Sequence, residues 1–184
     1  MIALLVIDMQ NAYFEDPALA PRQDTLVRAC NRLIAESAAS GAKILLVGTE
    51  HERDKSTWSL NMLDDDQGFI FRGSAQADFV PGLQTDGLPR LIKTRDSAFT
   101  GTDLLSRLRN WEVGEIVLAG VATHNCIAQT AADAFAHNVR VVYAEEAMAS
   151  GDERAAADML RILSDEYRQP VLSTDAIAKR LKGM

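Results

Sequence analysis

The sequence of 184 residues is short of several residue types, and each shortage excludes a class of protein. Only two cysteines are present, Cys30 and Cys126, which is too few for a disulfide framework and makes a reducing cytoplasm the expected compartment. Positive charge is also scarce, because 19 lysines and arginines face 26 aspartates and glutamates, for a formal net charge of −7. With no basic patch to release counterions from phosphates, we expect no nucleic-acid partner.

Long apolar runs are missing as well. The run at residues 2–7 has no basic segment before it and is ended by Asp8, so it fits neither a signal peptide nor a membrane span, and we expect no membrane partner. A hydrophobic content of 47% with 24% charged residues is ordinary for a globular protein. The length predicts a single domain over residues 1–184 with a substantial core.

A regular alternation of strand and helix patterns fills most of the chain. Continuous apolar runs, typical of parallel strands covered on both faces, alternate with segments of helical spacing. The alternation predicts an α/β fold, a three-layer α/β/α sandwich around a Rossmann-like, mainly parallel six-stranded sheet. We expect strands at residues 2–7, 43–48, 88–92, 115–119 and 139–143 and near residue 171, and helices at residues 24–40 and 123–137 and after residues 103, 153 and 173.

Within the helices, residue spacing predicts finer details. Phe135 is expected to face the core from the helix at residues 123–137. Thr100 with Asp103, and Ser150 with Glu153, have the spacing of capping boxes that open the helices after them.

Periodicity fails between residues 51 and 87, a segment that holds Trp58 and an acidic triplet at residues 64–66. It is long for a connection, and long ordered loops serve as lids over sites or as pieces of a subunit interface. The sequence does not separate these two interpretations.

Three reactive side chains follow predicted strands. Asp8 follows the first strand, Lys93 the strand that ends at Ile92, and Cys126 the turn after residues 115–119. Ligands of open parallel sheets bind beyond the carboxyl ends of the strands, so these side chains can converge there. Together they offer a base for the thiol proton, a cation for the thiolate and a nucleophile.

Each of these residues also has an ordinary interpretation. Asp8 fits a helix cap or a metal ligand, Lys93 a surface lysine, and Cys126 a small core residue. Cys30 lies on the apolar stripe of its helix and is assigned to the core. For Cys126, a position just inside a helix start is expected to lower the thiol pKa and to favour the thiolate.

Three motifs resemble those of the isochorismatase-like cysteine hydrolases, the group that includes nicotinamidases and N-carbamoylsarcosine amidohydrolase. They are LVIDMQN at residues 5–11, KTRDSAFTGTDL at residues 93–104 and AGVATHNCIAQT at residues 119–130. Each is modestly specific alone, and their shared order and spacing is a strong match.

The resemblance implies a catalytic triad of Asp8, Lys93 and Cys126. It also implies a cis peptide between Val121 and Ala122, whose role would be to aim the backbone N–H groups of Ala122 and Cys126 at one point as an oxyanion hole. The implied activity is hydrolysis of a small amide through a thioester, and the implied assembly is a homo-oligomer, a dimer or a tetramer.

The chain departs from relatives within this group. Nicotinamidases carry an Asp-x-His metal motif after the second strand, whereas residues 49–53 here read TEHER and no other histidine precedes His124. We therefore expect neither a zinc site nor any other cofactor, and nicotinamide falls in rank as a substrate. True isochorismatases, which cleave a vinyl ether, lack the nucleophilic cysteine, so Cys126 argues against that reaction.

Candidate substrate-binding residues follow the first strand or open the irregular segment. Aromatic side chains there can wall a small planar substrate or can be ordinary packing. The directions of His124 and Asn125, beside the nucleophile, cannot be derived from sequence. The candidates are Gln10, Tyr13, Phe14 and Trp58.

The sequence therefore predicts a metal-independent, cysteine-dependent hydrolase that cleaves a C–N bond of a small amide, ureide or carbamoyl compound. Three alternatives stay open. They are a non-covalent vinyl-ether hydrolase, a thiol-sensing protein, which would need a resolving thiol that Cys30 does not offer, and a catalytically silent assembly protein.

Overall fold

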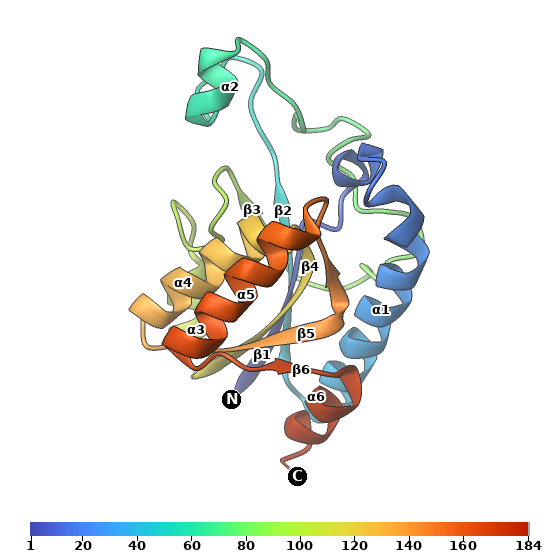
Figure 1. Ribbon diagram of the computed structural model, residues 1–184, viewed down its shortest axis with the longest axis vertical. Coiled ribbons are helices and arrows are strands. Elements are labelled where there is room, and N and C mark those ends of the chain that lie inside the picture. The colour runs from blue at the N-terminus through green and yellow to red at the C-terminus, as the bar shows by residue number, and fades with distance from the viewer. Residues whose placement is uncertain (184) are drawn as a thin grey trace.

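A computed structural model describes residues 1–183 and contains one six-stranded sheet with helices on both faces (Figure 1). The strand order is β3-β2-β1-β4-β5-β6, and every neighbouring pair is parallel. This is the predicted three-layer α/β architecture. The strands are β1 (Ile2–Ile7), β2 (Lys43–Thr49), β3 (Arg90–Lys93), β4 (Glu115–Val121), β5 (Arg140–Ala149) and β6 (Val171–Leu172).

Two hydrophobic layers cover the sheet. Helices α1 (Gln23–Ser40) and α6 (Thr174–Leu181) pack on one face, and α3 (Leu104–Asn110), α4 (Ala128–Ala136) and α5 (Glu153–Tyr167) pack on the other. Successive residues of β1 contribute to the two layers in turn, because side chains alternate across a strand. The continuous apolar runs therefore mark strands buried on both sides.

Short elements complete the chain. Two 3₁₀ turns, η1 (Asn11–Glu15) and η2 (Ala20–Arg22), lead from β1 to α1, and a π-helical turn, η3 (Thr123–Ile127), leads from β4 to α4. The single helix predicted for residues 123–137 is thus divided into two elements, η3 and α4, which meet just after Cys126. No helix within residues 1–183 is long and apolar enough to cross a membrane.

Three local predictions were wrong. Phe135 does not face the core, because its ring is 49% exposed and stacks on Tyr167 with the ring centroids 4.3 Å apart. Thr100 does not cap α3; instead the hydroxyl of Thr102 accepts a hydrogen bond from the N–H of Leu104 at 3.2 Å. Likewise Asp152, not Ser150, caps α5.

The capping oxygen of Asp152 accepts from the N–H of Ala155 at 2.8 Å. The hydroxyl of Ser150 is the acceptor for the N–H of Asp152 and lies beside the His124 ring. Ser173, at the start of α6, caps its helix by accepting from the N–H of Ala176.

The irregular segment contains a short helix, α2 (Leu60–Asp64), which stands away from the sheet at the top of Figure 1. Trp58 is buried within this projection, where its indole N–H donates to the carbonyl of Glu52 at 2.8 Å. Leu60, Leu63 and Phe69 are exposed on it. The segment remains predicted as either a lid or an interface.

Candidate active site

The carboxyl ends of the four strands β3, β2, β1 and β4 lie next to one another in the sheet, and each carries or precedes a polar side chain. Asp8 directly follows β1, Thr49 ends β2, Lys93 ends β3, and Cys126 lies in η3 after β4. Thr49 and Lys93 are register partners, so their side chains leave the sheet at the same level. The topology therefore gathers the three predicted residues, and a fourth, at one edge.

The backbone conformation at this edge allows neighbouring strands to approach closely. Asp8 has a φ of 54°, a conformation that aspartate tolerates better than most residues, and its N–H donates to the carbonyl of Val47 at 2.8 Å. Gly120 has a φ of 111°, and a Cβ there would lie 1.9 Å from the carbonyl oxygen of Ile7. Only glycine allows β1 and β4 to approach in this way. The peptide between Val121 and Ala122 is cis.

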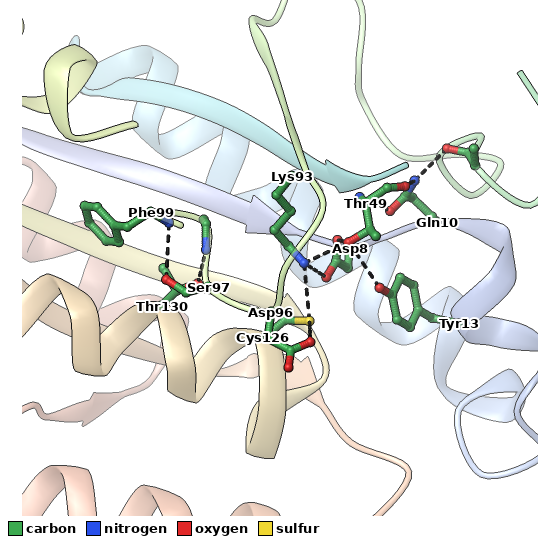
Figure 2. Close-up of polar contacts among 12 residues, drawn as sticks. Asp8, Gln10, Tyr13, Thr49, Lys93, Asp96, Ser97, Phe99, Cys126 and Thr130 are labelled. Atoms are coloured by element: carbon green, nitrogen blue, oxygen red, sulfur yellow. Dashed lines mark hydrogen bonds and ion pairs between the residues drawn. The ribbon is translucent and has the colours of Figure 1, made fainter. Parts of the chain in front are cut away.

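The Lys93 ammonium is the centre of the polar contacts (Figure 2). Its Nζ lies 2.8 Å from Asp8 Oδ2, 2.8 Å from Thr49 Oγ1 and 3.4 Å from Cys126 Sγ. The ammonium thus donates hydrogen bonds to Thr49 and Cys126 and forms an ion pair with Asp8. Asp8, Lys93 and Cys126 are 0%, 1% and 3% exposed, so the contacts form out of water, where electrostatic interactions are strongest.

Asp8 is held on one side and open on the other. Its Oδ1 accepts a hydrogen bond from the Thr49 hydroxyl at 3.0 Å. Its Oδ2 forms the ion pair with Lys93, yet receives no hydrogen bond of good geometry from residues 1–183. A lone pair of Oδ2 is therefore available for a proton.

Sequence analysis missed Thr49. Its hydroxyl accepts from Lys93 at 2.8 Å and from the Tyr13 phenol at 3.3 Å while donating to Asp8, so both lone pairs and the proton are used. Burial first, and then the negative charge of Asp8, raise the pKa of Tyr13 well above its usual value, which keeps the phenol a donor. A threonine at a strand end is also a common β-former, and only its place beside the aspartate strand distinguishes it.

The ionisation of the site differs from the sequence-based expectation. Burial first, and then the Asp8 carboxylate, raise the pKa of the Cys126 thiol well above its usual value, and the Lys93 charge offsets this only in part. The expected lowering by a helix start was therefore wrong, and the resting Cys126 side chain is a thiol. Burial lowers the pKa of Lys93, but Asp8 and Cys126 more than compensate, so it is raised and the ammonium stays charged.

The segment after Lys93 is hydrogen-bonded to α4, which directly follows the turn that contains Cys126. The N–H of Ala98 donates to the Thr130 hydroxyl at 3.0 Å, and the Ser97 hydroxyl donates to Asp133 Oδ2 at 2.5 Å. These contacts, drawn in part in Figure 2, fix the lysine motif against the cysteine motif.

Two of the candidate substrate-binding residues have structural roles instead. The Gln10 side chain is buried and donates to the carbonyls of Thr49 and Ala77 while accepting from the N–H of Thr49, so its amide is occupied by backbone. Phe14 is buried in the hydrophobic layer beneath α1. Trp58 lies in the projecting segment, and Tyr13 is the one of the four that bonds to the hydroxyl of Thr49.

The His124 ring contacts a residue at the start of α5. Its Nδ1 lies 2.5 Å from the hydroxyl of Ser150, which links η3 to the start of α5. Asn125 is half-buried and its N–H donates to the carbonyl of Ala122 at 3.1 Å. These contacts hold in place the turn that contains Cys126.

The charged and histidine side chains after β2 make contacts with other groups of the chain. His51 Nδ1 lies 2.9 Å from the carbonyl of Thr57, and Glu50 and Glu52 form ion pairs with Arg72. Within residues 1–183 no group of three or more histidine, cysteine, aspartate or glutamate side chains is arranged to hold a metal ion.

Comparison with known proteins matches this arrangement to a family. The family model described as the Isochorismatase domain matches residues 2–176. The chain belongs to the isochorismatase family. The family resemblance inferred from three motifs is thereby confirmed.

The relatives of this chain carry names that differ in the activity they state. A probable inactive nicotinamidase of Arabidopsis thaliana is 33% identical over 181 residues, which span 92% of this chain and 92% of that protein. The nicotinamidase/pyrazinamidase of Mycobacterium tuberculosis is 29% identical over 174 residues, which span 85% of this chain and 92% of that protein. An isochorismatase family protein from Desulfovibrio vulgaris has a TM-score of 0.85 at 30% identity, covering 98% of this chain and 97% of that chain.

Proposed function

We propose that the protein is a metal-independent cysteine hydrolase that cleaves the C–N bond of a small amide, ureide or carbamoyl compound. One observation carries the proposal: a buried nucleophile, base and cation in mutual contact, with Lys93 Nζ 2.8 Å from Asp8 and 3.4 Å from Cys126 Sγ. Relatives named as amide hydrolases support the reaction class.

In the first half of the proposed reaction, Asp8 Oδ2 takes the thiol proton as Cys126 Sγ attacks the carbonyl carbon. Lys93 balances the negative charge, and the backbone N–H groups of Ala122 and Cys126 receive the oxyanion. The tetrahedral adduct collapses, the C–N bond breaks, and Asp8 returns the proton to the departing amine or ammonia. A thioester on Cys126 remains.

The second half reverses the roles with water. Asp8 takes a proton from the water that attacks the thioester carbonyl, and the C–S bond breaks. The same proton returns to sulfur, so the product acid leaves and the resting thiol is restored. The raised pKa of the Cys126 thiol suits this cycle, because the proton moves only when substrate is in place.

An assay of ammonia release over amides, ureides and carbamoyl acids tests the proposal. Cys126→Ala should abolish turnover, and acid-quenched wild-type enzyme should carry an acyl adduct on the peptide containing Cys126. Cys30→Ala is the matched control, because Cys30 is fully buried in the core with its Sγ 3.8 Å from the carbonyl of Ala147. Retained ammonia release in Cys126→Ala would instead indicate a non-covalent route and overturn the thioester intermediate.

A catalytically silent protein is the second candidate, because the Arabidopsis relative is named probable inactive. Iodoacetamide distinguishes the two. Alkylation of Cys126 that is suppressed by a substrate amide supports the hydrolase, whereas alkylation that no amide suppresses, with no ammonia release, supports silence.

A further inference from the structure

A second carboxylate faces the nucleophile and has no part in the proposed triad. Asp96 lies three residues beyond Lys93 on an exposed turn, and its Oδ1 is 3.9 Å from Cys126 Sγ (Figure 2). Within residues 1–183 this carboxylate forms no ion pair and has no other side-chain hydrogen bond. The neighbouring Arg95 donates instead to the carbonyls of Thr57 and Thr94.

The charge of Asp96 is not balanced by the site around it. Asp8 and Lys93 neutralise one another, and the resting Cys126 is an uncharged thiol. Asp96 therefore makes the accessible side of the sulfur negative.

A negative charge in this position opposes the formation of a thiolate. Burial and Asp8 are the main causes of the raised pKa of Cys126, and Asp96 adds to them. Because Asp96 disfavours the activated nucleophile, activation does not explain its position. A positive or hydrogen-donating group on the substrate would explain it, because such a group would satisfy the carboxylate and remove its repulsion of the thiolate.

We propose that Asp96 determines specificity by receiving a cationic or N–H-bearing group attached beside the scissile carbonyl, and that it excludes substrates carrying a carboxylate there. This inference rests on the proposed hydrolase function. A sulfur about 3–3.5 Å from the carbonyl carbon places a substituent on the adjacent carbon within reach of Asp96. The preferred substrates are accordingly small α-ammonium or ureido amides, and carboxylate-bearing carbamoyl acids are disfavoured.

The charge at the thiol can be measured without any hydrolysis. Two methanethiosulfonate reagents of opposite charge, trimethylammonium-ethyl and sulfonato-ethyl, modify Cys126 in the Cys30→Ala background, and each rate is divided by that with the neutral methyl reagent. Wild type should favour the cationic reagent, and Asp96→Asn should lower the cationic-to-anionic ratio about tenfold. Asp86→Asn is the matched control, since Asp86 is exposed before the amino end of β3 and should leave the ratio unchanged.

Hydrolysis of two substrates of opposite charge completes the test. The ratio of kcat/KM for glycinamide to that for malonamate should fall about tenfold in Asp96→Asn and stay constant in Asp86→Asn. Hydrolysis with an unchanged ratio would overturn the assignment of Asp96 while keeping the hydrolase. A shifted modification ratio without hydrolysis of any amide would overturn the proposed function while keeping Asp96 as the group that receives cations at the thiol.

Discussion

Two ion pairs lie at opposite ends of the same sheet and differ in almost every respect. At the carboxyl end, Lys93 and Asp8 are 2.8 Å apart with side chains 1% and 0% exposed. At the amino end, where β4 begins, Arg180 and Glu115 are 2.6 Å apart with side chains 44% and 11% exposed, beside an open cavity of about 520 Å³. The reactive end is the closed one.

The difference shows which physical feature identifies function here. Burial of a complete ion pair is costly, and apolar residues of similar volume often give equal or better stability, so a fully buried pair needs a reason other than stability. A pair with a half-exposed member, such as Arg180, keeps its contact with water and needs no such reason. Cavity volume alone would indicate a site at the amino end of the sheet, whereas buried charge indicates one at Asp8 and Lys93.

Breaking the buried pair should have the largest effect of any change. Asp8→Asn removes the proposed base and leaves the Lys93 charge without its partner in the core. We expect turnover to fall about 1,000-fold or more and the free energy of unfolding to fall by about 3–5 kcal/mol. Ammonia release and urea denaturation measure the two effects.

Replacing both members separates function from stability. The double variant Asp8→Leu/Lys93→Met should recover most of the lost unfolding free energy, because no unpaired charge remains, and should stay inactive. A double variant as unstable as Asp8→Asn would show that the pair is kept for stability after all.

Removing the Thr49 hydroxyl should have the next largest effect. Thr49→Val keeps the shape but removes the hydrogen bond to Asp8 Oδ1 and one of the acceptors of Lys93, a loss of about 1–3 kcal/mol. If the loss falls on the transition state, kcat drops about 5- to 150-fold. We expect KM to change little, because Thr49 positions the base and does not contact substrate.

Thr49→Ser is the control for this position, because it retains the hydroxyl and should retain most of kcat. Equal losses in Thr49→Val and Thr49→Ser would instead mean that the missing methyl group matters more than the hydrogen bonds, and that Thr49 is a packing residue.

The carboxyl end could be predicted further from the sequence than the amino end. Apolar runs mark the strands, and parallel strands have their carboxyl ends at one edge of the sheet. Because reactive side chains follow those ends, Asp8, Lys93 and Cys126 could be grouped before any contact was known. Thr49 could not be included, since a threonine that ends a strand looks like any other β-former.

Other features depend on contacts between distant segments, which spacing does not reveal. Phe135 was assigned inward by helical period, but Tyr167 from α5 offers it an outer stacking partner. Gln10 was predicted to bind substrate, but its side-chain amide is hydrogen-bonded to the backbone of Thr49. The pKa of Cys126 depends on how completely the turn is buried, which the motif alone did not indicate.

The buried thiol of Cys126 should titrate at a higher pH than a free cysteine does. Burial and Asp8 raise the pKa of Cys126, so the thiol is protonated at neutral pH, and its alkylation by iodoacetamide should rise about tenfold per pH unit beyond pH 8.5, the pKa of a free cysteine. In Asp8→Asn, with one cause of the raised pKa gone and the Lys93 charge unopposed, alkylation at pH 8 should be faster than in wild type. A plateau below pH 7 in wild type would contradict the raised pKa.

The smallest effect is expected at the amino end. Glu115→Gln removes the charge that Arg180 meets there, but Arg180 is close to half exposed and water replaces the carboxylate, so the unfolding free energy should change by about 1 kcal/mol or less. Raising the salt concentration should reduce even this difference, since exposed charges are screened. Activity should equal that of wild type, because Glu115 begins β4 while η3 and Cys126 follow its other end. A Glu115→Gln variant with impaired turnover would show that the two ends of the sheet are coupled, and the buried pair would then not be the separate functional unit that its isolation from water indicates.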